Sequence, residues 1–297
     1  MNGGERGFLL LTSSLGDPDR HPLTAAQLRT LTRRARAMGK PETEREMTEA
    51  DLTVLGYSAP MAEHILRLLA DGDVLDHYVR RGQKAGCVPV TRISEGYPIL
   101  LRRHLGEESP GCLWAKGDLS LLGRPAVALV GNRELRERNR AFAREVGRQA
   151  ALQGFVLISG NARGADREAQ DACLEAEGAI ISVVADELAK RRPGARQLFL
   201  SEDGFDLPFS AQRAISRNRV IHAMGWRTLV AQVEEPSGGT WDGSVKNLRF
   251  GWSPLFCFDD GSRGSRMLID MGAGSASIEM LADFASLEQD ALSFFDQ

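Results

Sequence analysis

Two glycine turns decide the fold: Val130-Gly131-Asn132-Arg133 and Ser159-Gly160-Asn161-Ala162-Arg163-Gly164-Ala165-Asp166. A short apolar run precedes each turn, at residues 126–130 and 155–158, and a polar, helix-compatible segment follows. The order strand, glycine turn, helix therefore occurs twice. Because glycine has no Cβ and tolerates positive φ, such turns bring backbone N–H groups close to an anion at a helix N-terminus. The pattern predicts a phosphate-binding crevice.

Arginines accompany both turns and a later segment. Arg133 and Arg163 stand at or just past the glycines, where a guanidinium can make bidentate contacts with the same anion. Farther along, Arg217 and Arg219 flank Asn218. From a turn, two such arginines can converge on successive phosphates, although a solvated surface pair is the alternative.

A third glycine-rich segment follows an apolar run at residues 228–233. It contains Ser237, Gly238, Gly239 and Thr240, and it suits an anion or a ribose, or forms a plain surface turn. Asp166, directly after the second turn, is either a general base or, as we favour, the N-cap of the next helix.

The chain from residue 124 onward alternates apolar runs with amphipathic segments. We predict strands at 126–130, 155–159, 179–184, 228–233 and 254–258, with helices at about 138–152 and 166–177. Continuous apolar strands separated by helices indicate a doubly wound, mostly parallel α/β sheet of extended Rossmann-like type. Ligands of such folds bind at the carboxyl ends of the strands, where both glycine turns lie.

We expect four parts along the chain. Residues 1–85 form small helices, with Thr24 and Thr48 as N-caps, in a module of the SAM or helix-hairpin-helix type or a merely structural cap. Residues 86–123 are a linker and approach segment, residues 124–276 the Rossmann-like domain, and residues 277–297 an acidic, solvated C-terminal helix.

Composition excludes several classes of protein. The 297 residues carry a net charge of -3, so that any affinity for nucleic acid comes from a local patch. The loop at 190–196 and the helical ridge Arg140, Arg144 and Arg148 are either solvated or part of such a path. Four widely spaced cysteines and five scattered histidines favour buried thiols and no metal site. The sequence has neither a P-loop nor a Gly-x-Ser-x-Gly elbow, and without an apolar run of membrane-spanning length we expect it in the cytoplasm.

Taken in order, these motifs resemble those of the DNA-processing protein A family, also called DprA or Smf. The matching segments are Tyr97-Pro98, Lys116-Gly117-Asp118, Gly131-Asn132-Arg133, residues 159–166, Ser201-Glu202, Arg217-Asn218-Arg219 and Ser237-Gly238-Gly239-Thr240. Asn132 replaces the family's usual serine, Gln170 its common histidine, and Ala179 a frequent lysine.

The resemblance implies a homodimer that binds single-stranded DNA and hands it to the recombinase RecA. It also implies a protein that catalyses no reaction and needs no cofactor. Lys246 or Arg249 would extend the phosphate track, and Trp241 or Phe209 would stack on bases. The alternative is a nucleotide sensor, as in a defence system, or a hydrolase like the LOG-type phosphoribohydrolases. The catalytic glutamate of that group corresponds to Gly243, so Asp242 or Glu234 would have to replace it.

Overall fold

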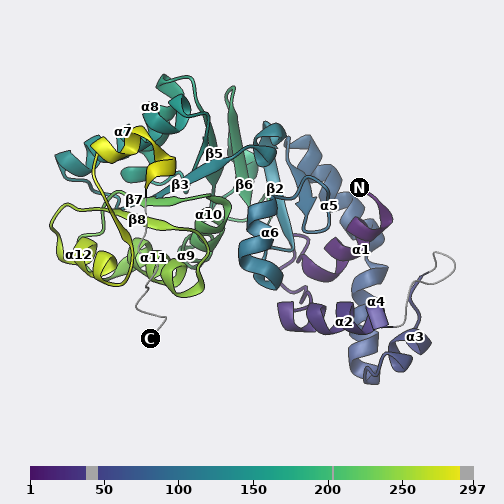
Figure 1. Ribbon diagram of the computed structural model, residues 1–297. Helices are drawn as coiled ribbons and strands as arrows, with labels where there is room; N and C mark the ends of the chain where they lie inside the picture. Colours follow the sequence, from purple (N-terminus) through teal and green to yellow (C-terminus); the bar gives the residue numbers. More distant parts are fainter. Residues whose placement is uncertain (38–45, 203, 288–297) are drawn as a thin grey trace.

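The structure is a computed structural model that describes residues 1–37, 46–202 and 204–287 (Figure 1). Its centre is a nine-stranded sheet in the order β1-β2-β6-β5-β4-β3-β7-β8-β9. The strands are β1 (Val88–Thr91), β2 (Cys112–Gly117), β3 (Ala126–Val130), β4 (Val156–Ser159), β5 (Ala179–Val183), β6 (Gln197–Ser201), β7 (Thr228–Val230), β8 (Leu255–Phe258) and β9 (Gly274–Ala276).

The sheet is doubly wound, as predicted. From β6 through β9 all neighbouring strands are parallel, whereas β2 pairs antiparallel with both β1 and β6. The chain runs from β3 outward through β4, β5 and β6, and then returns to place β7, β8 and β9 on the other side of β3. The strand order thus reverses between β3 and β7, and open α/β sheets bind ligands at the carboxyl ends beside such a switch point.

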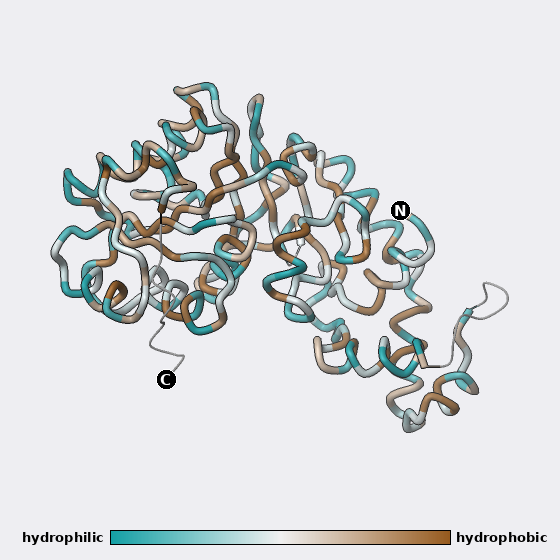
Figure 2. The backbone as a smooth tube through the Cα atoms, viewed as in Figure 1, coloured by the Kyte–Doolittle hydropathy of each residue, from teal (hydrophilic) through white to brown (hydrophobic). Residues whose placement is uncertain are grey.

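Helices cover both faces of the sheet (Figure 1). Those that follow β1 are α6 (Ile99–Leu105), α7 (Glu137–Leu152), α8 (Ala165–Glu175), α9 (Ala211–Ser216), α10 (Asn218–Met224), α11 (Gly238–Phe250) and α12 (Arg263–Asp270). Strand β3 shows why two layers form, because its side chains alternate between the faces. Val127 and Leu129 pack with α7 and α8, and Ala128 and Val130 pack with α10 and α11. Figure 2 shows the hydrophobic stretches concentrated along these central strands.

The N-terminal region is helical, as predicted. It comprises α1 (Gly3–Thr12), α2 (Ala25–Ala37), α3 (Glu49–Val54), α4 (Ala59–Ala70) and α5 (Gly72–Lys84). Thr48 caps α3 in a full capping box with Asp51, and the Gln27 amide donates to the Thr24 hydroxyl before α2. A separate core of leucines and Ile65 holds α2, α3 and α4 together. Helices α1 and α5 instead pack against β2, where Tyr78 and Trp114 are buried.

Two expected segments differ from the structure. Residues 86–123 are not a linker: they supply β1, β2 and α6, and the sheet continues across the boundary expected at residue 123. Residues 277–287 do not form a solvated α-helix. They form the 3-10 turns η4 (Glu279–Ala282) and η5 (Phe284–Ser286), which bury Leu281, Phe284 and Leu287 against the sheet. The rest of that expected helix, residues 288–297, lies outside the described residues.

Other expectations concern thiols and membranes. Cys87, Cys112, Cys173 and Cys257 are free and buried, as predicted, and burial raises the pKa of all four thiols. Across the described ranges, no helix combines the length and apolar character that a membrane span requires.

Candidate functional site

The two glycine turns pack closely against each other at the carboxyl ends of β3 and β4. A Cβ on Gly131 would stand 2.5 Å from the Cβ of Ala165, and a Cβ on Gly164 would overlap the carbonyl oxygen of Asn132. Gly164 also has a φ of +87°, which side chains rarely adopt. The Ala165 amide donates to the Asn132 carbonyl at 3.1 Å. The glycines are therefore required first for the packing of one turn on the other.

Asp166 organises the second turn and does not cap its helix. Gly164 is the N-cap of α8, whereas the buried Asp166 carboxylate accepts the amides of Gly160 at 3.0 Å and Ala162 at 3.1 Å. The N-cap prediction for Asp166 was therefore wrong. Burial raises the pKa of Asp166, against the opposing effects of the Arg217 charge and the two amides. Because these two amides are already engaged, they do not face a ligand.

Ser159 lies beneath the turn and not in a pocket. Its hydroxyl is fully buried and accepts from the Gln170 amide at 2.6 Å, and the same amide group donates to Ser182 at 2.9 Å. Gln170 thus ties α8 to the ends of β4 and β5. Ser159 therefore supports the second turn from beneath instead of facing a ligand.

Arg217 joins the three motifs. Its guanidinium donates to the Gly160 carbonyl at 3.1 Å and to the Asn218 side-chain oxygen at 3.0 Å, and the Asn218 amide donates to the Gly239 carbonyl at 3.0 Å. Any Cβ on Gly160 would overlap this guanidinium. Only 9% of Arg217 is exposed, and its buried Nε has no hydrogen-bond partner among the described residues. Burial lowers the pKa of Arg217, but an arginine remains charged in proteins.

Arg217 and Gly160 form one wall of a pocket of about 610 Å³, which we call the arginine pocket. It is lined by Arg133, Glu134, Gly160, Asn161, Ala162, Arg163, Val184, Ala185, Asp186, Arg191, Phe209, Ala214 and Arg217. The Phe209 side chain, 59% exposed, is its only aromatic residue within the described chain. The sequence reasoning did not identify Val184, Ala185 and Asp186, which enter because β5 ends beside β4.

The charges of this pocket fall into two groups. Arg163 pairs with Glu134 at 2.9 Å and Arg191 pairs with Asp186, so that these two arginines are neutralised. Arg133 and Arg217 have no carboxylate within ion-pair distance in the part of the chain that the structure describes. The pocket therefore has two arginines without a direct ion pair over glycine-turn backbone, although the Asp166 carboxylate acts on the Arg217 charge from nearby. This setting suits a phosphate.

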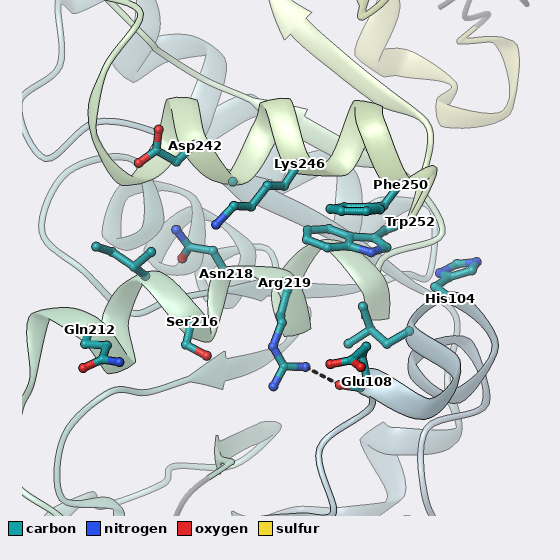
Figure 3. A pocket seen from close by; sticks show the side chains of 13 residues that line it. His104, Glu108, Gln212, Ser216, Asn218, Arg219, Asp242, Lys246, Phe250 and Trp252 are labelled. Carbon is teal, nitrogen blue, oxygen red and sulfur yellow. Dashed lines mark hydrogen bonds between the residues drawn. The ribbon is translucent and has the colours of Figure 1, made fainter. Parts of the chain in front are cut away.

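Arg219 does not converge with Arg217, contrary to the expectation for this segment. It donates to the Glu108 carbonyl at 2.7 Å and to the Glu202 carboxylate at 2.6 Å, within a different pocket (Figure 3). Arg219 thereby connects α10 to the 3-10 turn η1 (Gly106–Glu108) and to the end of β6. The reason is that the helix breaks at Arg217, between α9 and α10, and sends the two guanidinium groups apart.

The Ser237–Thr240 segment is the start of α11 and not a free loop. Ser237 is its N-cap without a side-chain bond, and Gly238 has a φ of +84°. Asn218 holds this end of α11 through Gly239, but none of the four residues lines the arginine pocket. The two acids considered for a hydrolase also lie outside the arginine pocket. Glu234 pairs with Arg136, and Asp242 lines the neighbouring pocket.

The basic ridge on α7 is neutralised by acidic side chains. Arg140 pairs with Glu168 at 2.8 Å, Arg144 with Glu175 at 2.6 Å, and Arg148 with Glu145 at 2.6 Å. Exposed ion pairs of this kind are typical of a solvated surface. No cluster of three or more histidine, cysteine or acidic side chains placed to hold a metal occurs among residues 1–37, 46–202 and 204–287.

Comparison with known proteins agrees with this geometry. The model of the family described as DNA recombination-mediator protein A matches residues 89–285. The chain belongs to this family. It is 26% identical over 174 residues to DNA processing protein DprA of Bacillus subtilis, which covers 53% of this chain and 56% of that protein. It is 26% identical over 287 residues to DprA of Streptococcus pneumoniae, covering 80% of this chain and 99% of that protein.

Solved structures of the family share the fold. The structure of DprA from Streptococcus pneumoniae matches with a TM-score of 0.68 at 23% identity, over 90% of this chain and 99% of that one. DprA from Helicobacter pylori, whose structure is described as showing a single-stranded DNA binding mode, matches with a TM-score of 0.55 at 23% identity, over 66% of this chain and 94% of that one. The resemblance stated from the motifs is confirmed.

Proposed function

We propose that this chain binds single-stranded DNA in the arginine pocket and catalyses no reaction there. The observation that carries the proposal is Arg217, a nearly buried guanidinium that borders the pocket without a carboxylate partner among the described residues. The nearby Asp166 carboxylate acts on this guanidinium without a direct ion pair, and a DNA phosphate would give it a direct, hydrogen-bonded partner. The single-stranded DNA binding mode described for Helicobacter pylori DprA supports the same ligand.

The strand's phosphate would contact Arg217 and Arg133, the two arginines of the pocket that make no direct ion pair among the described residues. Gly160, which has no side chain, leaves the room that the Arg217 guanidinium occupies. The exposed ring of Phe209 is available for stacking on a base, which is sequence-tolerant because every base has a π-face. The Arg163–Glu134 and Arg191–Asp186 pairs would hold the loops at the rim.

The proposal includes two partners. We infer a homodimer and a transfer of the bound strand to RecA, and the family's description as a recombination mediator supports that transfer. The chain should accelerate the assembly of RecA on a single strand and should sediment as a dimer. An unchanged rate of RecA assembly would remove the transfer step and leave the binding proposal standing.

Fluorescence anisotropy of a labelled single strand tests the binding proposal. Wild-type protein should bind, duplex DNA and mononucleotides should compete poorly, and affinity should fall as salt rises because each neutralised phosphate releases counterions. Arg217→Gln should bind the strand markedly more weakly, whereas Arg144→Gln on the ion-paired surface of α7 should bind it like wild type. Displacement of the strand by a mononucleotide would instead assign the arginine pocket to a nucleotide.

A further inference from the structure

A second pocket adjoins the first across α9 and the start of α10. Its volume is about 940 Å³, and we call it the aromatic pocket. Ala214 and Arg217 line the arginine pocket, whereas Ile215, Ser216 and Arg219 line the aromatic pocket. The spacing of three and four residues places each set on its own side of this helical segment. One helix thickness thus separates the two pockets, and Asn218 stands directly beside Arg217 at the divide.

The aromatic pocket has a flat ring surface. Phe250 and Trp252 stack with ring centroids 5.7 Å apart and an interplanar angle of 19°. Trp252 is buried, but 59% of Phe250 is exposed (Figure 3). An exposed phenyl ring supported from behind by a buried indole is a rigid stacking surface for another planar ring.

One available cation lies beside these rings. Lys246 precedes Phe250 by one turn of α11 and lines the same pocket, and its side chain extends from α11 toward Asn218 (Figure 3). Lys246 has no ion pair or hydrogen bond with another described residue, whereas the donors of Arg219 are engaged by Glu202 and the Glu108 carbonyl. Lys246 is therefore the group that an incoming anion would meet.

We propose that the aromatic pocket takes one nucleotide of the same single strand, with its base on Phe250 and its phosphate at Lys246. This inference rests on the proposed function, because the strand would reach the pocket by passing Asn218 from Arg217. The ligand class follows from the chemistry: a planar ring and an anion on one ligand match a ring surface and a lone ammonium. Asp242 lies one turn of α11 before Lys246 and two turns before Phe250, so its carboxylate is on the phosphate side of the pair and disfavours a second phosphate there.

The test compares intact and base-deleted strands. Phe250→Ala should weaken binding of an intact labelled strand about tenfold, as loss of one stacked base does. In a series of strands with a single abasic site, the affinity of the wild-type protein should fall by a similar factor when the missing base is the one that stacks on Phe250. The affinity of Phe250→Ala should not fall further for that strand. Lys246→Gln should weaken binding and flatten its salt dependence. Leu152→Ala and Lys84→Gln, both exposed and outside the two pockets, are the matched controls.

The outcomes separate this inference from the proposed function. Wild-type affinity in Phe250→Ala, with binding still weakened in Arg217→Gln, would overturn the inference and leave the proposed function intact. Absence of strand binding by the wild-type protein would overturn the proposed function itself. Binding of a free mononucleotide that depends on Phe250, without strand binding, would also overturn the inference. If Phe250→Ala unfolds at a lower urea concentration than wild type, Phe250→Leu replaces it, because leucine keeps most of the side-chain volume without the ring. The affinity of Phe250→Leu for the strand then tests the same point.

Discussion

Replacing Arg217 by glutamine should separate the binding role of this residue from its structural role. The guanidinium contacts the Gly160 carbonyl and Asn218, and its charge opposes the rise that burial imposes on the pKa of Asp166. The variant Arg217→Gln therefore removes the proposed phosphate contact and also leaves the Asp166 carboxylate buried without its nearby cation. A second substitution can restore the lost stability but not the lost phosphate contact.

The expected sizes follow from these contacts. A hydrogen bond to a charged group contributes about 1.5–3 kcal/mol, so loss of the phosphate contact should weaken strand binding by roughly 10- to 150-fold. The slope of log affinity against log salt should become shallower by about 0.7, the value for one phosphate contact on a single strand. Leaving a buried charged group uncompensated should lower the free energy of unfolding by about 1–3 kcal/mol.

The double variant Asp166→Asn with Arg217→Gln provides the control. One carboxylate oxygen of Asp166 accepts both turn amides, and the side-chain oxygen of an asparagine can accept them equally. Urea unfolding should therefore show most of the lost stability restored, while anisotropy should show that strand binding stays weakened. The reasoning is refuted if the double variant binds like wild type, or if Arg217→Gln binds normally at unchanged stability.

Three further changes probe the same region. Gly160→Ala should abolish strand binding, because its Cβ would occupy the place of the Arg217 guanidinium; tight binding in anisotropy would show that the guanidinium can move without loss. His222 is fully buried with no partner for either ring nitrogen among the described residues, and burial lowers its pKa to about 3. The imidazole titrates near pH 6.5 in the unfolded chain, so the neutral His222 contributes its full share to the free energy of unfolding above that pH. This stability is lost as the pH falls from 6.5 toward 3, and about 1.4 kcal/mol of it is lost at pH 5.5. Urea unfolding of His222→Leu at pH 7.5 and 5.5 should lack this part of the decline, and an identical decline in both proteins would contradict it. Arg219→Ala should destabilise the contact between α10 and η1, because α10 then loses the hydrogen bond from Arg219 to the Glu108 carbonyl at 2.7 Å; limited proteolysis near η1 should accelerate, and an unaltered cleavage rate would argue against a connecting role.

Much of the central fold could be predicted because its signals are local. Apolar runs that end in glycine and precede amphipathic segments predict strand, turn and helix from the local sequence alone. Strands β3, β4, β5, β7 and β8 occur where they were predicted. A short strand was also expected at residues 87–90, but it was placed with residues 112–117 in an approach segment outside the main sheet, because a strand's place in a sheet depends on its neighbour. Val88 pairs with Ala115, and Trp114 with Ser201, across long stretches of chain.

The C-terminal segment was misjudged for a related reason. Its acidic residues suggested a solvated helix, but Leu281, Phe284 and Leu287 find buried places beside α7 and the sheet. Apolar burial of this kind outweighs a weak preference for helix, and a charge pattern does not report whether a complementary surface exists.

The parallel sheet, the two glycine turns and the family motifs could be predicted from short segments, because backbone conformation at glycine and the spacing of apolar residues are local properties. Only the tertiary structure decided which side chains meet. It turned Asp166 back onto the turn, placed Gln170 beneath Ser159, and sent Arg217 and Arg219 into different pockets. Side-chain directions depend on where a helix breaks and on what packs beside it, and those are set by contacts between segments far apart in the chain.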